Sequence, residues 1–109
     1  MLTEAKQYLG VDDYAKALPL LEKAAAAGTS DAMNSLGLLY ENGQGVARDY
    51  ARALQLFQKA AAARNAKAMH NLAAMHALGR GVPQNDGQAR DWYVKAAAVV
   101  SAKALNNLG

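Results

Sequence analysis

The fold is decided by residues 32–61, which read AMNSLGLLYENGQGVARDYARALQLFQKAA. Residues 68–97, 36 positions further on, read AMHNLAAMHALGRGVPQNDGQARDWYVKAA. The alanines, a leucine, the paired glycines and the final Lys-Ala-Ala recur at the same offset. One period earlier, Lys23 stands in register with Lys59. Matches at a fixed offset indicate an internal repeat, and a period of this length is typical of solenoid proteins.

Each period is predicted to form two helices joined by a turn. Apolar residues recur at helical spacing over residues 31–41 and 49–63, and Gly43 and Gly45 between them supply turn conformations. Over the whole chain we expect helices at residues 2–9, 13–27, 31–41, 49–63, 67–78, 86–98 and 101–108. The expected fold class is all-α, an α-solenoid of stacked antiparallel helix pairs in a right-handed superhelix, because one hairpin cannot bury its apolar face alone.

The period also predicts a single domain over residues 1–109. Its repeats are expected at about residues 1–28, 29–64 and 65–100, with the start of a further repeat at 101–109. The chain would then stop inside a repeat and leave Leu105 and Leu108 uncovered, although terminal repeats of solenoids normally have a polar outer face. We therefore expect either a piece of a longer array or a homo-oligomer in which two copies cover each other's C-terminal helices.

Residue sizes predict how the helices pack. Alanines recur where neighbouring helices should approach, and Gly37 and Ala73 lie at equivalent positions. A larger side chain at these positions would push the helices apart. The large residues predicted to fill the remaining space are Leu20, Leu56 and Trp92 in one register and Leu21, Phe57 and Tyr93 in the next.

Pro19 interrupts the second expected helix. Proline lacks the amide donor and crowds the preceding turn of a helix. We expect a kink at this position, or a helix that begins later than Tyr14.

The ends of the repeats also differ. Gly28 is suited to the left-handed conformation that closes a helix, and its counterparts are Arg64 and Val100. Valine is β-branched and strongly disfavours that conformation. We therefore expect the third repeat to end differently, with a helix that runs past residue 98 or with Ser101 as the cap of the next helix.

The chain resembles the Sel-one-like repeat (SLR) family, a subgroup of the tetratricopeptide class. The family pattern is roughly A-x-x-x-L-G-x-x-Y-x-x-G-x-G-V, followed by an aspartate, an alanine, an aromatic residue and K-A-A. The repeat at residues 29–64 matches this pattern, and the next repeat departs from it at Ala73, His76 and Asn85. The resemblance covers nearly the whole chain. It implies an adaptor, often bacterial, with protein or peptide ligands.

Composition excludes some classes of function. The chain has 12 Lys and Arg residues and 9 Asp and Glu residues, which gives a net charge of +3. They are scattered among acids and do not form the stripe typical of nucleic-acid binders, so we expect no nucleic-acid partner. There is no cysteine for disulfide or thiol chemistry. We expect no membrane insertion, because no apolar run is long enough. No signal peptide is visible, and cytoplasmic and periplasmic locations both stay open.

Candidate catalytic and metal-binding motifs have simpler structural explanations. Gly43-x-Gly45 lacks the preceding strand and the third glycine of a dinucleotide fingerprint. His70 and His76 lie six residues apart, about 240° around a helix, so they cannot share a metal ion on one face. No nucleophile, base and orienting group can be placed in register. We therefore expect no catalytic residue, no cofactor and no metal site.

The expected binding surface is the concave face, which in tetratricopeptide arrays is lined by the first helix of each repeat. By this resemblance, polar side chains about 10 Å apart form a ladder able to hydrogen-bond an extended peptide or a partner's helix. The residues assigned to partner binding are Asp31, Asn34, Leu38, Glu41, Lys67, His70, Asn71, Lys103 and Asn106. Two alternatives stay open. Either these residues form only the solvent-exposed faces of their helices and bind no partner, or the chain is a self-assembling structural module.

Overall fold

The computed structural model describes the backbone of residues 14–108 and the side chains of residues 14–103. Its helices are α2 (Tyr14–Ala26), α3 (Ser30–Asn42), α4 (Tyr50–Ala62), α5 (Ala66–Leu78) and α6 (Asp86–Leu108). No strand occurs in residues 14–108, and the all-α prediction is confirmed. The helix expected at residues 2–9 lies outside the described residues.

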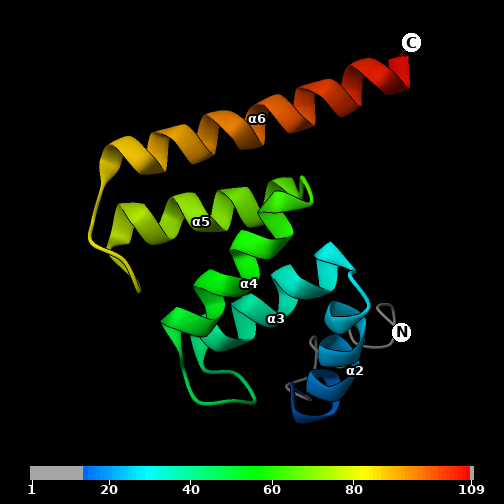
Figure 1. Cartoon of the computed structure of the whole chain (residues 1–109), viewed down its shortest axis with the longest axis vertical. Coiled ribbons are helices and arrows are strands. Elements are labelled where there is room, and N and C mark those ends of the chain that lie inside the picture. The colour runs from blue at the N-terminus through cyan, green and yellow to red at the C-terminus, as the bar shows by residue number, and fades with distance from the viewer. Residues whose placement is uncertain (1–13, 109) are drawn as a thin grey trace.

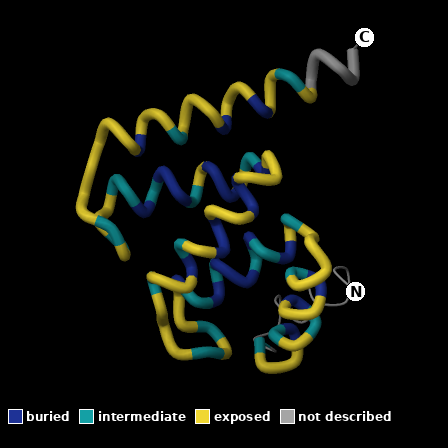
Figure 2. The backbone as a smooth tube through the Cα atoms, viewed as in Figure 1, coloured by how far each residue is buried: buried dark blue, intermediate teal, exposed yellow. Residues whose placement is uncertain are grey.

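The helices form a stack in which each packs on the next (Figure 1). α2 packs on α3, α3 on α4, α4 on α5, and α5 on α6. α6 lies at one end of the stack, and much of its length is exposed (Figure 2). Each helix is therefore stabilised by its neighbours in sequence, as in other solenoids.

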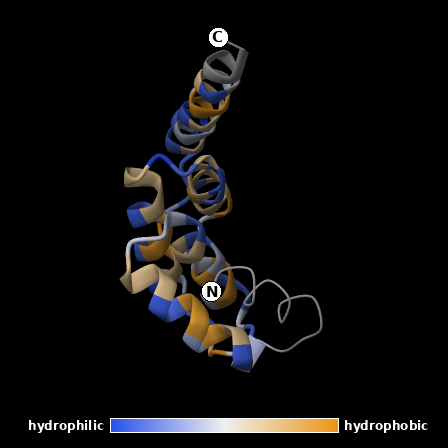
Figure 3. Ribbon diagram, turned by 90° about the vertical axis from the view of Figure 1, so that its right-hand side faces the viewer, coloured by the Kyte–Doolittle hydropathy of each residue, from blue (hydrophilic) through white to orange (hydrophobic). Residues whose placement is uncertain are grey.

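The buried apolar side chains gather into two clusters. The N-terminal cluster contains Ala17, Leu21, Ala24, Ala32, Leu36, Leu39 and Leu56. The C-terminal cluster contains Ala53, Phe57, Ala60, Ala61, Ala68, Met69, Leu72, Met75, Ala96 and Val99. Met33 and Tyr40 pack against both clusters. Hydrophobic and hydrophilic residues are interspersed along the helices (Figure 3), and no helix in the described part is long and apolar enough to cross a membrane.

Side-chain caps and a glycine define several helix ends. Asp49 accepts a hydrogen bond from the amide of Arg52 (3.0 Å) at the start of α4. Asn85 accepts one from the amide of Gln88 (3.0 Å) at the start of α6, so it keeps the capping function of aspartate at this position. α3 ends at Gly43, whose φ of 66° is left-handed.

Gly37 lies where α3 meets α4. A Cβ atom added to it would stand 2.6 Å from Cε1 of Phe57, well inside van der Waals contact. Phe57 is fully buried in the C-terminal cluster. Ala73, the counterpart of Gly37 in the next repeat, is also fully buried. The prediction that helix approach requires a small residue at Gly37 is therefore confirmed.

The expectations for the third repeat were partly wrong. A separate helix at residues 101–108 does not exist, because α6 continues without a break from Asp86 to Leu108. The alternative that a helix runs past residue 98 is confirmed, and Val100 does not take the left-handed conformation. Tyr93 does not fill the core but is 39% exposed, and its ring packs against His70 of α5.

The helix with Pro19 gives one further correction, and the turn at Arg64 gives a new observation. α2 includes both Tyr14 and Pro19, so a later start is wrong, while the kink stays a prediction. The left-handed turn at Gly28 (φ 94°) recurs at Arg64 (φ 65°). Both turns have the same hydrogen bonds: the amides of Gly28 and Arg64 donate to the carbonyl three residues earlier, and the following amides to the carbonyl five residues earlier. Arginine therefore adopts a conformation that glycine favours.

Candidate functional site

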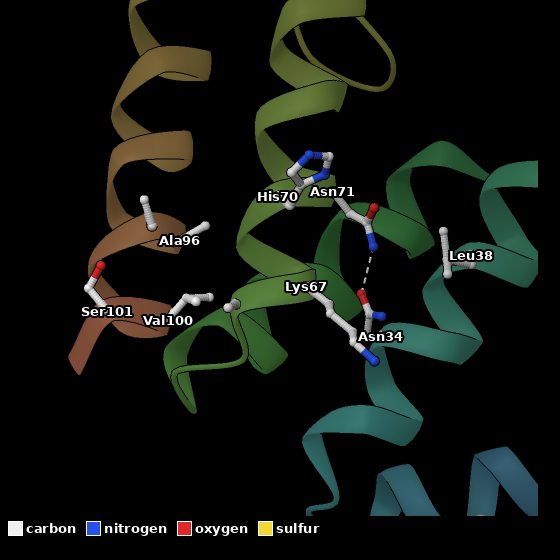
Figure 4. A pocket seen from close by; sticks show the side chains of 10 residues that line it. Asn34, Leu38, Lys67, His70, Asn71, Ala96, Val100 and Ser101 are labelled. Carbon is white, nitrogen blue, oxygen red and sulfur yellow. Dashed lines mark hydrogen bonds between the residues drawn. The ribbon is translucent and has the colours of Figure 1, made fainter. Parts of the chain in front are cut away.

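A groove opens between α3, α5 and α6. Its volume is about 720 Å³, and α5 lies between the other two helices (Figure 4). Its lining residues are Asn34 and Leu38 from α3, Ala66, Lys67, His70 and Asn71 from α5, and Ala96, Ala97, Val100 and Ser101 from α6. Three alanines, a leucine and a valine give the groove a largely aliphatic surface with a few polar groups.

Asn34 and Asn71 join two repeats inside the groove. Nδ2 of Asn71 donates a hydrogen bond to Oδ1 of Asn34 over 2.7 Å, and Asn34 is only 6% exposed. His70 is the residue that stands one 36-residue period after Asn34, but it is the next residue that makes this contact. One residue corresponds to about 100° around a helix, so Asn71 turns towards Asn34 and His70 turns away.

Lys67 and His70 are exposed on α5. The imidazole of His70 packs edge-on against the ring of Tyr93 from α6, with centroids 5.0 Å apart and an interplanar angle of 68°. This aromatic contact links α5 to α6 beside the groove. The side chain of Lys67 extends along the groove towards Asn34 (Figure 4), which places a cation next to the aliphatic surface.

A second hollow adjoins the groove where α4 turns into α5. Its volume is about 340 Å³, and it shares Ala66, Lys67 and Val100 with the groove. Its other lining residues are Ser30, Asp31, Ala63, Arg64, Asn65 and Lys103. Three cationic side chains and one carboxylate thus surround this junction hollow.

Asn65 holds the junction hollow together. Its Oδ1 accepts a hydrogen bond from the amide of Ala68 (3.0 Å) and caps α5. Its Nδ2 donates to Oδ1 of Asp31 (2.8 Å) and to Oγ of Ser30 (3.3 Å). Since Asn65 is 8% exposed, these bonds form a nearly buried link between the starts of α3 and α5.

The nine residues assigned to partner binding occupy different places. Asn34, Leu38, Lys67, His70 and Asn71 line the groove, and Asp31 and Lys103 line the junction hollow. Glu41 lines neither: it is buried, and its Oε2 stands 3.5 Å from Nη1 of Arg80. A residue held in this ion pair does not present its carboxylate to the groove. The side chain of Asn106 lies outside the described residues.

Sequence reasoning missed the α6 side of the groove. Ala96 and Ala97 line it from within the helix expected at residues 86–98, and Val100 and Ser101 line it because α6 continues past the point where that helix was expected to end. The signal for this continuation is Val100, which does not favour the closing turn. In the described part of the chain, no three His, Cys, Asp or Glu side chains are grouped so that they could hold a metal ion.

The sequence matches the model of the Sel1 repeat three times, at residues 6–29, 30–65 and 66–98. Among solved structures, the chain is similar to a Sel1 repeat protein from Oxalobacter formigenes, with 32% identity and a TM-score of 0.84 over 90% of this chain and 40% of that chain. It is also similar to a protective antigen of uropathogenic Escherichia coli strains that displays an SLR fold, with 30% identity and a TM-score of 0.82 over 89% of this chain and 22% of that one.

A third similar structure is Helicobacter pylori cysteine rich protein B, with 30% identity and a TM-score of 0.73 over 84% of this chain and 68% of that chain. The chain spans less than half the length of the first two proteins. No curated protein sequence matches it. The three repeat matches and these likenesses lead to one conclusion: the chain belongs to the Sel1 repeat family, whose members are generally protein-interaction scaffolds and typically non-catalytic.

Proposed function

We propose that the chain is a scaffold that holds a peptide segment of a partner protein in the groove between α3, α5 and α6. The observation that carries this proposal is the groove itself, an open and largely aliphatic surface built from three helices of successive repeats. Its volume of about 720 Å³ is in the range of sites that enclose most of a small ligand. It therefore suits several side chains of a peptide.

The exposure of Val100 supports the same function. This side chain is 57% exposed at the edge of the groove, beside Ala96 and Ala97. Covering it with a partner's apolar side chain would contribute on the order of 1 kcal/mol. The Asn34–Asn71 pair and Lys67 add polar groups that can orient the bound segment.

The test uses two neighbouring alanines of α6, Ala97 and Ala98, both of which are exposed. Only Ala97 lines the groove. A phage-displayed library of random peptides is selected on the immobilised chain, and enriched peptides are then measured by fluorescence anisotropy. Ala97→Arg should abolish their binding, and Ala98→Arg should leave it within about twofold, as expected of an exposed substitution outside the contact. Equal binding to both variants would place the site elsewhere.

A self-assembling module is the second candidate, and the surface of α6 favours it. Among the described residues, three of the exposed large hydrophobic side chains lie on this helix, and Val94 is 62% exposed without lining the groove. A second copy of the chain could cover this surface. Light scattering should then show a dimer at high concentration, and Val94→Glu should return it to a monomer. A wild type that stays monomeric would remove this candidate.

A further inference from the structure

We infer that the bound partner segment carries an acidic side chain next to its apolar residues, and that Arg64, Lys67 and Lys103 receive this side chain in the junction hollow. The inference rests on the proposed function and names the chemistry of the partner. It specifies an aspartate or glutamate that precedes or follows the apolar residues held in the groove.

The first argument is continuity. The junction hollow and the groove share Ala66, Lys67 and Val100, so the two lie side by side. A peptide whose apolar side chains lie against Ala96 and Ala97 can place its next residue in the junction hollow. Lys67 stands at the boundary and contributes to both.

The second argument is the charge around the junction hollow. Arg64, Lys67 and Lys103 are exposed, and no carboxylate in the described part lies within ion-pairing distance of any of the three. The one acidic residue of the hollow, Asp31, already accepts a hydrogen bond from Asn65. A carboxylate that enters would therefore meet three cationic side chains and one carboxylate, a net charge of +2 in the lining of the hollow. The positive end of the α5 dipole acts in the same direction.

The third argument is the backbone at Arg64. It is the one non-glycine residue with positive φ in the described part of the chain. The equivalent turn of the preceding repeat has Gly28, which takes this conformation without a steric penalty. Arginine at this position disfavours the turn but adds a cation to the junction hollow. Residues held in such conformations cluster at binding sites.

The experiment uses the same peptide selection on further variants. The cation-free variant carries Arg64→Gly, Lys67→Gln and Lys103→Gln. The matched control carries Lys23→Gln, Lys59→Gln and Lys95→Gln, which remove the same charge from three exposed lysines that line neither the groove nor the junction hollow. Each peptide enriched on the wild type is synthesised twice, once as selected and once with Asn or Gln in place of Asp or Glu.

We expect acidic residues beside apolar residues in the enriched peptides. The amide versions should bind the wild type about 10-fold more weakly, as three partly exposed charge contacts allow, and higher salt should weaken the acidic peptides alone. The cation-free variant should lose this preference, and the control should keep it. Circular dichroism should show that both variants remain folded.

Two results would contradict the inference in different ways. If acidic peptides and their amide versions bind the wild type equally, and both lose binding to Ala97→Arg, the acidic subsite is overturned. The proposed function of the groove would then stay in place. A selection that yields no peptide able to distinguish the wild type from Ala97→Arg would overturn the proposed function and the inference with it.

Discussion

Gly37 allows α3 and α4 to approach each other, because a Cβ atom at this position would stand 2.6 Å from Phe57. Gly37→Ala should therefore destabilise the protein by about 1–2 kcal/mol, since the overpacking cost of roughly 1–3 kcal/mol exceeds the helix-propensity gain of up to about 1 kcal/mol. Urea denaturation would measure the change. In a Phe57→Leu background the same substitution should cost less, because the clashing ring edge is gone. An equal cost in both backgrounds would show that the ring is not the cause.

Arg64 offers the opposite test, because its left-handed φ of 65° is a conformation that glycine adopts without steric cost. Arg64→Gly should stabilise the protein by about 0.5–1 kcal/mol, the relief of roughly 1–2 kcal/mol being reduced by glycine's greater freedom in the unfolded chain. The variant should at the same time bind acidic peptides less tightly.

Gly28 provides the control for this backbone effect. A Cβ atom added at Gly28 (φ 94°) would meet nothing within 4 Å, so Gly28→Ala isolates the conformational penalty from packing. We expect a loss of about 0.5–1 kcal/mol, after the same allowance for glycine's freedom in the unfolded chain. If Arg64→Gly destabilised the protein instead, the arginine side chain would be making contacts that stabilise the turn.

Asn65 connects two helices as well as capping one. Asn65→Ala removes the cap of α5 together with the bonds to Asp31 and Ser30, and should cost about 2–3 kcal/mol. Asp49→Ala is the matched control, because Asp49 is exposed and caps α4 through the amide of Arg52; it should cost about 1 kcal/mol. Thermal or urea unfolding would compare the two, and equal losses would mean that the inter-repeat bonds contribute nothing.

α6 should depend on Val100 for its length. Val100→Gly costs the helix about 0.5 kcal/mol in propensity and supplies a residue that can take the closing turn seen at Gly28. We expect α6 to end near Ala98, and Cα chemical shifts to show the loss of helix over residues 101–108. Val94→Gly, a change of another exposed valine within the same helix, should lower helicity without creating an end there.

At the level of the whole molecule, the repeat period predicts most of the fold. The glycines that end α3 and α5 and the caps at Asp49 and Asn85 recur with the period, because they are local features that each repeat needs on its own. The polar contacts between repeats do not follow from it. The Asn34–Asn71 and Glu41–Arg80 pairs join residues 37 and 39 positions apart, and these offsets depend on how the helices cross. The groove was only partly predicted for another reason, since Val100 and Ser101 line it because one helix replaces two.

The two hydrophobic clusters predict that stability differs along the stack. Leu21 is fully buried in the N-terminal cluster, and Leu72 is 1% exposed in the C-terminal cluster. Either leucine replaced by alanine should cost about 2–5 kcal/mol, a large part of the 5–15 kcal/mol typical of a domain. Because each helix is stabilised mainly by its neighbours, the loss should stay near the substitution.

Hydrogen exchange of backbone amides would resolve this difference helix by helix. Leu21→Ala should lower the protection of α2 and α3 far more than that of α5 and α6, and Leu72→Ala should reverse the order. α4 should respond to both, because it contributes Leu56 to the N-terminal cluster and Phe57 to the C-terminal cluster. Uniform loss of protection in both variants would instead show that the whole stack unfolds as one unit. Graded loss would mean that the α5 and α6 side of the groove survives damage to α2, while its α3 side, with Asn34 and Leu38, is weakened.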